Sequence, residues 1–502
     1  MSGPLFESVE KVWKGEIIDA LVDYVTIPAL SPAFDADWHG HGDIERAVTL
    51  LQKWAESRPI VGLQVDVVRL DADPGTAADP TPATPLTPLI AVEVAAFAGS
   101  DPGPVPGTAS GEATVLCYGH YDKQPPMAGW REGLGPWTPV IEEGRLYGRG
   151  AADDGYALFA CLAAIEAVQQ GGHPHQRCVI LIEGSEESGS PHLPAYLKAL
   201  AERIGDPSLV ICLDSGCADY ERLWVTTSLR GMAAGVLSVE ITEEGRHSGA
   251  VGGVIPSTFR IARQLLDRIE DSTTGEVLLA EANVDIPPER IVQAGQLVES
   301  VGDGIDGYPL LAGVNVRTKP GPQLVLDRTW RAALHVIGAD GLPPTGQAGN
   351  VLRPRTALKL SLRLAPTADP LAATAALGAA LTRDPPYGAR VSFSADPPAP
   401  GWNAPPLQQW VLDALEAGSQ AHFGRSVGFV GEGGTIPLMG TLQAGFPEAQ
   451  LLVMGVLGPG SNAHGPNEFL HLGMGVGLTA CVAELLVAHH QQLASIPAGP
   501  VR

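Results

Sequence analysis

The chain has 502 residues, of which 45% are apolar, so it is long enough for two or three domains and can bury a large core. It carries 32 Lys and Arg against 56 Asp and Glu, which gives a formal net charge of -24. That charge would repel a nucleic-acid backbone or an anionic membrane surface, so we expect neither nucleic acid nor a membrane as a partner.

The N-terminal segment 1–25 has the pattern of an amphipathic helix with charges throughout. Because a basic start followed by an unbroken apolar core is missing, we expect no signal peptide. A second helix is predicted over 41–56, where apolar residues recur at helical spacing. The residues that share its apolar face are Ile44, Ala47, Val48, Leu51 and Trp54.

Three short apolar runs, 113–119, 177–184 and 208–214, are rich in Val, Ile and Leu and do not alternate with polar residues. Such runs are typical of strands that are covered on both faces in a parallel sheet. Helical segments over 154–170 and 192–204 lie between the first and the last of them. This alternation predicts an α/β domain with a mostly parallel sheet and helices on both faces.

Two Pro-, Gly- and Thr-rich stretches, 71–88 and 99–112, are predicted as surface loops around a short strand. After about residue 227 the pattern changes to half-polar, alternating segments, which favour antiparallel strands with helices on one side. From about residue 402 helices and buried strands return. The predicted organisation is an α/β domain in two parts, 1–227 and 402–502, interrupted by an inserted α+β domain, 228–401.

The cysteines show neither paired spacing nor a regular framework, and most lie in apolar stretches. They predict buried free thiols in a reducing compartment, and therefore a cytoplasmic location. The apolar stretch 472–488 is interrupted by Glu484 and begins with several glycines, so we expect a buried helix rather than a membrane span. The six cysteines are Cys117, Cys161, Cys178, Cys212, Cys217 and Cys481.

Histidines and carboxylates follow the predicted strands, and in open α/β sheets sites form at the carboxyl ends of strands. Gathered in a partly desolvated cleft, these groups would repel one another, and divalent cations are the simplest way to neutralise them. Mixed imidazole and carboxylate ligands without cysteine suit zinc, with manganese or cobalt as alternatives. The candidate residues are His120, Asp122, Asp153, Asp154, Glu186, Glu187, Asp214 and His464.

Five motifs around these residues carry a resemblance when taken together and in order. They resemble the di-zinc amidohydrolase and peptidase family that includes carboxypeptidase G, aminoacylase, acylornithine deacetylase and carnosinase-like dipeptidases. The match covers nearly the whole chain and implies a two-metal hydrolase of amide bonds. The motifs are GHYD (119–122), YGRGAADDG (147–155), EGSEESGS (183–190), LDSG (213–216) and AHGPNE (463–468).

The resemblance implies a role for each ligand. His120 and Asp214 would bind one metal ion, and Glu187 and His464 would bind the other. Asp153 would bridge the two ions, and the peptide bond that follows it would be cis. Such a site holds two divalent ions per subunit, most simply Zn²⁺.

The same resemblance assigns the proton chemistry. Glu186 would be the general base that takes a proton from a water bridging the metal ions and passes it to the leaving amine. Asp122 would accept a hydrogen bond from His120 and fix the tautomer of that imidazole.

The inserted domain offers further matches to the family. His247 would stabilise the carbonyl oxyanion, in dimeric members by reaching across from the partner subunit, so we expect a homodimer through this domain. Asn350 and Arg363 would contact the substrate, because a guanidinium binds both oxygens of a terminal carboxylate. An ordinary surface charge is an equal alternative for Arg363. The segment that contains Gly434 and Thr435 resembles a glycine-rich loop that lies near the substrate's carboxylate in the family.

The chain also departs from the family, because it has Asp-Asp-Gly-Tyr after the bridging position where members often have Asp-Asp-Lys-Gly, and this places Tyr156 nearby. The expected activity is hydrolysis of dipeptides or short peptides with a free C-terminal carboxylate. Deacylation of N-acyl amino acids is the alternative within the same chemistry, although the segment 186–196 and the chain length favour a peptidase. A metal-free scaffold or binding protein of the same fold is the non-enzymatic alternative.

Overall fold

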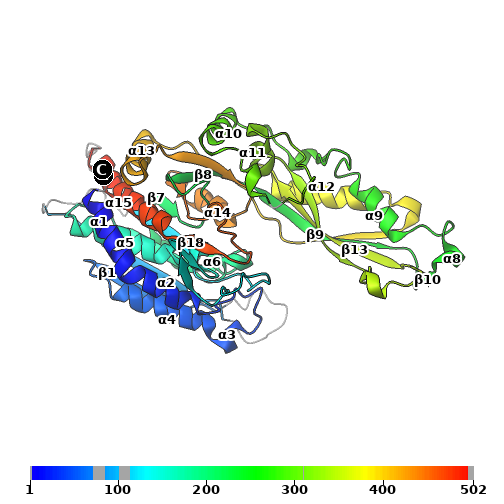
Figure 1. Cartoon of the computed structure of the whole chain (residues 1–502), viewed down its shortest axis with the longest axis horizontal. Helices are drawn as coiled ribbons and strands as arrows, with labels where there is room; N and C mark the ends of the chain where they lie inside the picture. Colours follow the sequence, from blue (N-terminus) through cyan, green and yellow to red (C-terminus); the bar gives the residue numbers. More distant parts are fainter. Residues whose placement is uncertain (1–2, 72–84, 101–112, 309, 496–502) are drawn as a thin grey trace. The chain divides into compact units, whose positions relative to one another are not determined.

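The computed structural model shows helices and strands along the residues that it describes (Figure 1). The predicted loops 71–88 and 99–112 lie mostly outside the residues that it describes. The described stretches are 3–71, 85–100, 113–308 and 310–495.

By its contacts the chain divides into two compact units. The first unit consists of Met1–Thr226, Ala404–Val430 and Thr441–Arg502, and the second of Thr227–Asn403 and Gly431–Gly440. The sequence-based boundaries lie close to two of these divisions. The short segment Gly431–Gly440 differs, because the sequence assigned it to the α/β domain whereas its contacts are with the second unit.

The first unit is built on a six-stranded sheet with the order β1-β2-β6-β3-β7-β17. Strand β3 is parallel to both β6 and β7, and β17 is parallel to β7. Strand β2 is antiparallel to both β1 and β6. The three predicted apolar runs are β3, β6 and β7, and all three are buried along nearly their whole length. The bounds are β1 Leu63–Val68, β2 Leu89–Val94, β3 Thr114–His120, β6 Cys178–Glu183, β7 Pro207–Cys212 and β17 Gln450–Val453.

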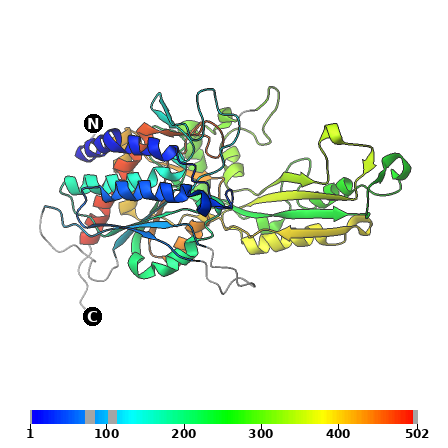
Figure 2. The ribbon, with the colours of Figure 1, turned by 90° about the horizontal axis from the view of Figure 1, so that it is seen from below.

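Helices lie on both sides of this sheet (Figure 2), which confirms the predicted fold class. Helix α5 packs on β3 and β6, and α15 packs on α5, α13 and α1. The bounds are α1 Pro4–Val12, α2 Ile18–Val25, α3 Trp38–His41, α4 Asp43–Glu56, α5 Ala157–Gln170, α6 Leu193–Ala199, α7 Ala201–Ile204, α13 Gln409–Phe423, α14 Pro437–Gly445 and α15 Leu472–Ser495.

The glycines at the start of α15 are explained by its packing. A Cβ at Gly475 would lie 2.5 Å from the ring of Trp13, so only glycine lets this helix approach the indole so closely. The indole N–H of Trp13 donates to the hydroxyl of Thr479 at 3.0 Å, which satisfies its buried polar atom. This contact joins the two ends of the chain in one core.

Helix α15 is the one helix among the described residues that is long and apolar enough to cross a membrane. However, 78% of its most apolar window is buried inside the structure. It therefore packs as a core helix, as the sequence predicted.

The second unit has a four-stranded antiparallel sheet with the order β11-β13-β9-β14, as predicted. Helices α9 and α12 pack on this sheet and enclose an apolar core (Figure 1). The bounds are β9 Gly231–Glu240, β10 Arg246–His247, α8 Ser248–Val251, α9 Thr258–Leu266, α10 Pro288–Val301, α11 Pro322–Thr329, β11 Ala333–Asp340, β12 Val351–Leu352, β13 Arg355–Leu364, α12 Pro370–Thr382 and β14 Arg390–Ala395.

Short strands complete the structure in two further three-stranded sheets. One has the order β18-β5-β4 and the other β15-β8-β16. Their bounds are β4 Val140–Glu142, β5 Arg145–Tyr147, β8 Trp224–Leu229, β15 Trp402–Asn403, β16 Gly428–Glu432 and β18 Phe469–His471.

A substitution at Gly455, which follows β17, tests how tightly the segment after β7 is packed. A Cβ at this position would lie 1.8 Å from the carbonyl oxygen of Ser215, so Gly455→Ala must push the backbone away. We expect the variant to lose about 1–3 kcal/mol of unfolding free energy, measured by urea denaturation. Gly15→Ala is the control, because nothing lies within 4 Å of its Cβ. Equal stability of the two variants would contradict the packing described.

Candidate active site

The carboxyl ends of β3, β6 and β7 bring the predicted ligand residues to one edge of the sheet. Strand β3 ends at His120, which pairs in register with Glu183 at the end of β6. Strand β7 ends at Cys212, shortly before Asp214. Because these strands are parallel, the loops that follow them leave the sheet on the same side, and side chains from distant parts of the sequence meet there.

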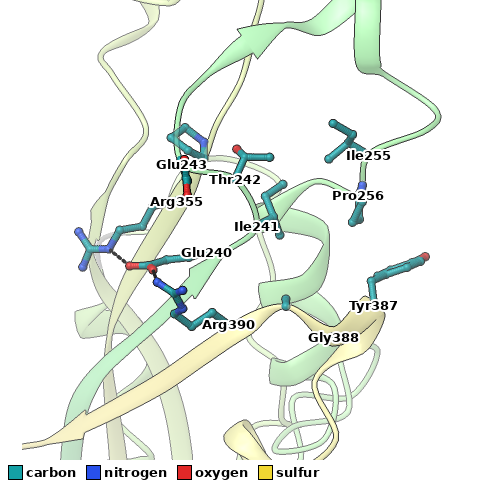
Figure 3. Close-up of a pocket in the computed structure, with 12 residues that line it drawn as sticks. Glu240, Ile241, Thr242, Glu243, Ile255, Pro256, Arg355, Tyr387, Gly388 and Arg390 are labelled. Carbon is teal, nitrogen blue, oxygen red and sulfur yellow. Dashed lines mark hydrogen bonds and ion pairs between the residues drawn. The ribbon is translucent and has the colours of Figure 1, made fainter.

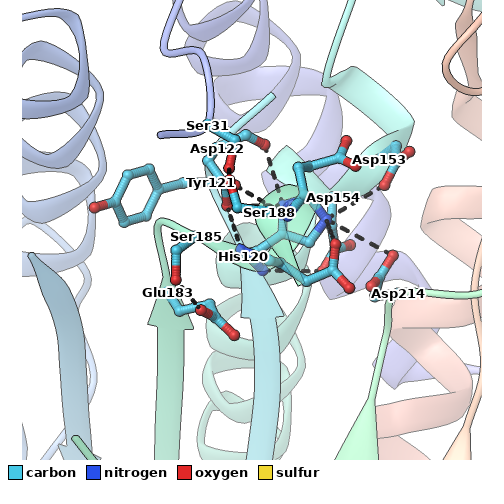
Figure 4. A network of polar contacts seen from close by, with 12 residues as sticks. Ser31, His120, Tyr121, Asp122, Asp153, Asp154, Glu183, Ser185, Ser188 and Asp214 are labelled. Atoms are coloured by element: carbon cyan, nitrogen blue, oxygen red, sulfur yellow. Dashed lines mark hydrogen bonds and ion pairs between the residues drawn. The ribbon is translucent and has the colours of Figure 1, made fainter. Parts of the chain in front are cut away.

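The imidazole of His120 is buried among the carboxylates of this group (Figure 4). Its Nε2 lies 3.3 Å from Oδ1 of Asp153 and 3.8 Å from Oδ1 of Asp214. The same nitrogen lies 3.9 Å from Oε2 of Glu186. One imidazole nitrogen therefore faces carboxylates that come from three different loops.

Asp153 uses its two carboxylate oxygens toward different imidazoles. Oδ1 faces His120, whereas Oδ2 lies 3.0 Å from Nε2 of His464. That histidine nitrogen is also 3.3 Å from Oε2 of Glu187. Asp153 thus lies between two sets of ligand-type side chains.

Possible ligand atoms form two overlapping groups. Those of His120, Glu186 and Asp214 lie within 4.8 Å of one another, and so do those of His120, Asp153 and Glu187. The predicted metal ligands are therefore close together in the first unit. The first group also contains Glu186, the predicted base, so its carboxylate lies close to the ligand-type atoms of His120 and Asp214.

Burial has the largest effect on the pKa values in this cluster, and it raises those of Glu186 and Glu187 well above the ordinary value. The charges of Asp214 and Asp153 raise these two pKa values further. Burial opposes the charged forms of His120 and Asp153 as well, but their hydrogen bonds prevail, so the pKa of His120 is raised and that of Asp153 is lowered. Divalent cations would neutralise such crowded buried carboxylates, and the oxygen and nitrogen donors fit them.

Asp122 organises the loop that carries both glutamates. Its Oδ1 accepts the backbone N–H of Glu186 at 3.2 Å, and its Oδ2 accepts that of Glu187 at 3.1 Å. Nδ1 of His120 lies 3.4 Å from the Asp122 carboxylate and 3.1 Å from its backbone carbonyl oxygen. Asp122 therefore contacts His120 through its backbone carbonyl and its carboxylate, and it also fixes the turn after β6, which the sequence did not indicate.

A buried ion pair, Arg149 with Glu468, was missed in the sequence although both residues lie in the motifs quoted above. The guanidinium of Arg149 binds the carboxylate of Glu468 and donates to the carbonyl of Gly465 at 2.8 Å. Glu468 in turn accepts the N–H of Gly150 at 2.8 Å. Burial raises the pKa of Glu468 to about 7, with the charge of Asp153 adding to the effect. The pair fastens the loop after His464 to the turn before Asp153.

Three more polar residues support the ligands. Gln124 donates to Oε2 of Glu187 at 2.6 Å. The peptide bond from Asp153 to Asp154 is cis, as the resemblance implied, and the buried Asp154 carboxylate accepts the backbone N–H of His120 at 3.3 Å. Tyr156, which stands where the chain departs from the family motif, donates its hydroxyl to the carbonyl oxygen of Leu213. It thereby links the Asp153 turn to the segment before Asp214.

The remaining predicted residues belong to the second unit. His247 is exposed in β10, and the N–H of Ser248 after it donates to the carbonyl of Asn350 at 2.8 Å. Arg363 in β13 donates to the hydroxyl of Thr435 at 3.0 Å. Gly434 is exposed beside that threonine. The structure thus brings His247 close to Asn350, and Arg363 close to Thr435.

Residues 116–488 match the model of Peptidase family M20/M25/M40. The chain belongs to this family. Membership confirms the predicted resemblance and the predicted enzyme class, a metal-dependent peptidase.

The peptidase is 28% identical to a cysteinylglycine-S-conjugate dipeptidase of Corynebacterium striatum, over 71% of this chain and 76% of that protein. It is 26% identical to the Cys-Gly metallodipeptidase of Schizosaccharomyces pombe, over 77% of this chain and 80% of that protein. The solved structure of the dipeptidase Dug1p of Saccharomyces cerevisiae shares its fold with a TM-score of 0.76, at 23% identity, over 97% of this chain and 98% of that one.

The peptidase also has a pocket of about 800 Å³ at the ends of β9 and β14 in its second unit (Figure 3). The carboxylate of Glu240 lies between Arg355 and Arg390 there, at 3.6 and 3.4 Å. Both arginines of the pocket are therefore paired with this carboxylate, and none of the predicted site residues lines it. The volume of a pocket therefore does not by itself identify the candidate active site of this protein.

Metal binding should stabilise the first unit of the peptidase. Ions that bind the folded ligand set and not the unfolded chain add about 2.7 kcal/mol at a concentration about 100 times the Kd. We expect zinc, manganese or cobalt to raise the thermal midpoint of the metal-free protein, measured by calorimetry, and a chelator to reverse the rise.

Asp153→Asn should remove most of this response, because it takes away the carboxylate shared by both imidazoles. Asp413→Asn, an exposed change on α13, should keep it. If none of the three ions changes the thermal midpoint of the unchanged protein, the result would argue against a metal site at this cluster.

Proposed function

We propose that the peptidase uses two divalent metal ions to hydrolyse dipeptides or short peptides with a free C-terminal carboxylate. The observation that carries this proposal is the carboxylate of Asp153, whose oxygens face His120 on one side and His464 on the other. A carboxylate in that position can serve two ions at once. The relatives named above are dipeptidases, which favours a small peptide over an N-acyl amino acid as substrate.

In this proposal the cluster, which is mostly buried but includes the exposed His464, holds both ions. His120 and Asp214 hold one, and Glu187 and His464 hold the other. Zinc suits this mixture of imidazole and carboxylate donors, and manganese and cobalt accept the same groups. When bound, the ions would supply Lewis acidity, which polarises the scissile carbonyl and lowers the pKa of water.

Glu186 is proposed as the general base. Burial, and next the charge of Asp214, raise its pKa, and a carboxylate with a raised pKa is a stronger base. The Glu186 carboxylate would take a proton from the attacking water and deliver it to the nitrogen of the leaving amine. Asp122, which accepts the backbone N–H of Glu186, keeps this carboxylate near His120.

Substrate recognition is proposed for the second unit. The guanidinium of Arg363 can bind both oxygens of a terminal carboxylate, beside Gly434 and Thr435. His247 and Asn350 would bind the carbonyl oxygen of the scissile bond, where negative charge develops.

We also propose a cytoplasmic homodimer in which the second unit serves as lid and dimerisation domain. All six cysteines are buried thiols, which fits a reducing compartment. The exposed imidazole of His247 is available to a second subunit.

Glu186→Gln should lower kcat for a zinc-loaded dipeptidase reaction by about 10²–10⁴-fold, because the amide cannot take up a proton. The reaction is followed by amino acid release. Metal content should stay near that of the unchanged protein, whereas Glu187→Gln, at a proposed ligand, should lose metal. Unchanged turnover in Glu186→Gln would exclude the role of base.

If His247 completes the site of a partner subunit, two inactive variants should rescue each other. Mixed dimers of Glu186→Gln and His247→Ala contain one site with neither change, so part of the activity should return after subunit exchange. Exchange is verified by mass spectrometry of the mixed dimer. Dimers that exchange without regaining activity would show that each chain completes its own site.

A further inference from the structure

A second guanidinium lies beside Arg363 in the second unit. Arg230 precedes β9, and β9 pairs with β13 so that Arg363 lies opposite Met232. The hydroxyl of Thr435 connects the two arginines, because it accepts from Nη1 of Arg363 at 3.0 Å and donates to the backbone carbonyl of Arg230 at 2.5 Å. Two neighbouring strands and one loop thus hold both arginines together.

The guanidinium of Arg230 is held by neutral groups. Nε donates to the carbonyl of Gly433 at 3.2 Å, and Nη1 approaches the carbonyl of Arg331 at 3.4 Å. Within the part of the chain that the structure describes, no carboxylate lies within 4.0 Å of the guanidinium of Arg230 or Arg363. The side chains are therefore positioned, but their charges are not neutralised.

This lack of a counter-charge stands out in a protein with a net charge of -24. The buried Arg149 binds Glu468, and the buried Arg58 lies 2.9 Å from Glu166. Arg230, by contrast, is half-buried among positive neighbours. Burial first, and then the charges of Arg363 and Arg328, lower its pKa to about 10.

The nearby acidic residue does little to neutralise the charge of Arg230. Glu432 lies in the strand before Gly433, and burial raises its pKa while the charge of Arg328 opposes the rise. The carboxyl of Glu432 therefore interacts mainly with Arg328, and it does not neutralise the charge of Arg230. Half-burying a charge without a partner is unfavourable, and a bound anion would remove that cost.

The loop beside these arginines leaves room for a ligand. Gly434 is exposed, and a Cβ built on it would meet nothing within 4 Å. An extended ligand can therefore approach the loop backbone next to the hydroxyl of Thr435 without a steric clash.

We propose that Arg230 and Arg363 together bind a C-terminal aspartate or glutamate, so that the preferred substrates are dipeptides with an acidic C-terminal residue. Arg363 binds the terminal carboxylate, as in the proposed function on which this inference rests, and Arg230 binds the side-chain carboxylate. Two guanidinium groups and two carboxylates balance in charge, and the planar fork of arginine suits both contacts. A neutral C-terminal residue leaves Arg230 unpaired.

The test compares Ala-Glu with Ala-Gln, which have nearly the same shape but differ by one charge. A charged hydrogen bond contributes about 1.5–3 kcal/mol, so kcat/KM should favour Ala-Glu by about 10–100-fold. Arg230→Gln should remove most of that preference by lowering kcat/KM for Ala-Glu, with Ala-Gln little changed. Arg363→Gln should lower kcat/KM for both dipeptides.

Arg260→Gln is the matched control, because it removes one exposed positive charge from α9 of the same unit and should keep the preference. Inhibition of the unchanged protein gives a measurement that does not depend on any variant folding. N-acetylglutamate should inhibit hydrolysis at about one tenth or less of the concentration needed with N-acetylglutamine.

Equal kcat/KM for Ala-Glu and Ala-Gln would overturn the inference, and so would a preference that survives in a folded Arg230→Gln protein. Hydrolysis of neutral dipeptides without hydrolysis of Ala-Glu would overturn it too, while leaving the proposed function intact. If the zinc-loaded protein hydrolyses no dipeptide at all, the proposed function itself fails.

Discussion

Mutual repulsion among buried carboxylates is the constraint around which the first unit is built. Asp153, Glu186, Glu187 and Asp214 approach one another at the ends of parallel strands, where burial already opposes their charge. The imidazoles of His120 and His464 lie against these carboxylates and can offset part of their charge. The fold holds this unfavourable arrangement in place because the sheet beneath it is apolar and tightly packed.

Gln124 supports the Glu187 carboxylate directly, but several other supporting contacts act on the backbone segments that carry the ligands. Asp122 holds two successive N–H groups of the turn after β6. Arg149 and Glu468 fasten the His464 loop to the turn before Asp153, and Tyr156 fastens that turn to the segment before Asp214. Each loop of the site is thus tied to at least one other loop, so the ligand positions depend on one another.

The sequence predicted those parts of the fold that follow from local pattern. Runs buried on both faces identified β3, β6 and β7, and the residues after them identified the cluster. The antiparallel direction of β2 could not be predicted, because its apolar run looks like that of its parallel neighbours. The ion pair of Arg149 with Glu468 was also missed, since the partners lie 319 residues apart and each has a plausible surface role alone. Arg230 precedes a strand and belongs to none of the quoted motifs, so only its place beside Arg363 marks it.

The interrupted order of the first unit has a consequence for how the protein is made. Strand β17, helix α15 and His464 belong to the last segment, Thr441–Arg502, so they leave the ribosome after the whole second unit has been synthesised. Until then the edge of β7 that pairs with β17 is bare, α5 lacks its covering helix, and one imidazole of the cluster is missing. A nascent chain therefore lacks part of the candidate site, and an abortive product that stops before this segment exposes apolar surface for quality control to recognise.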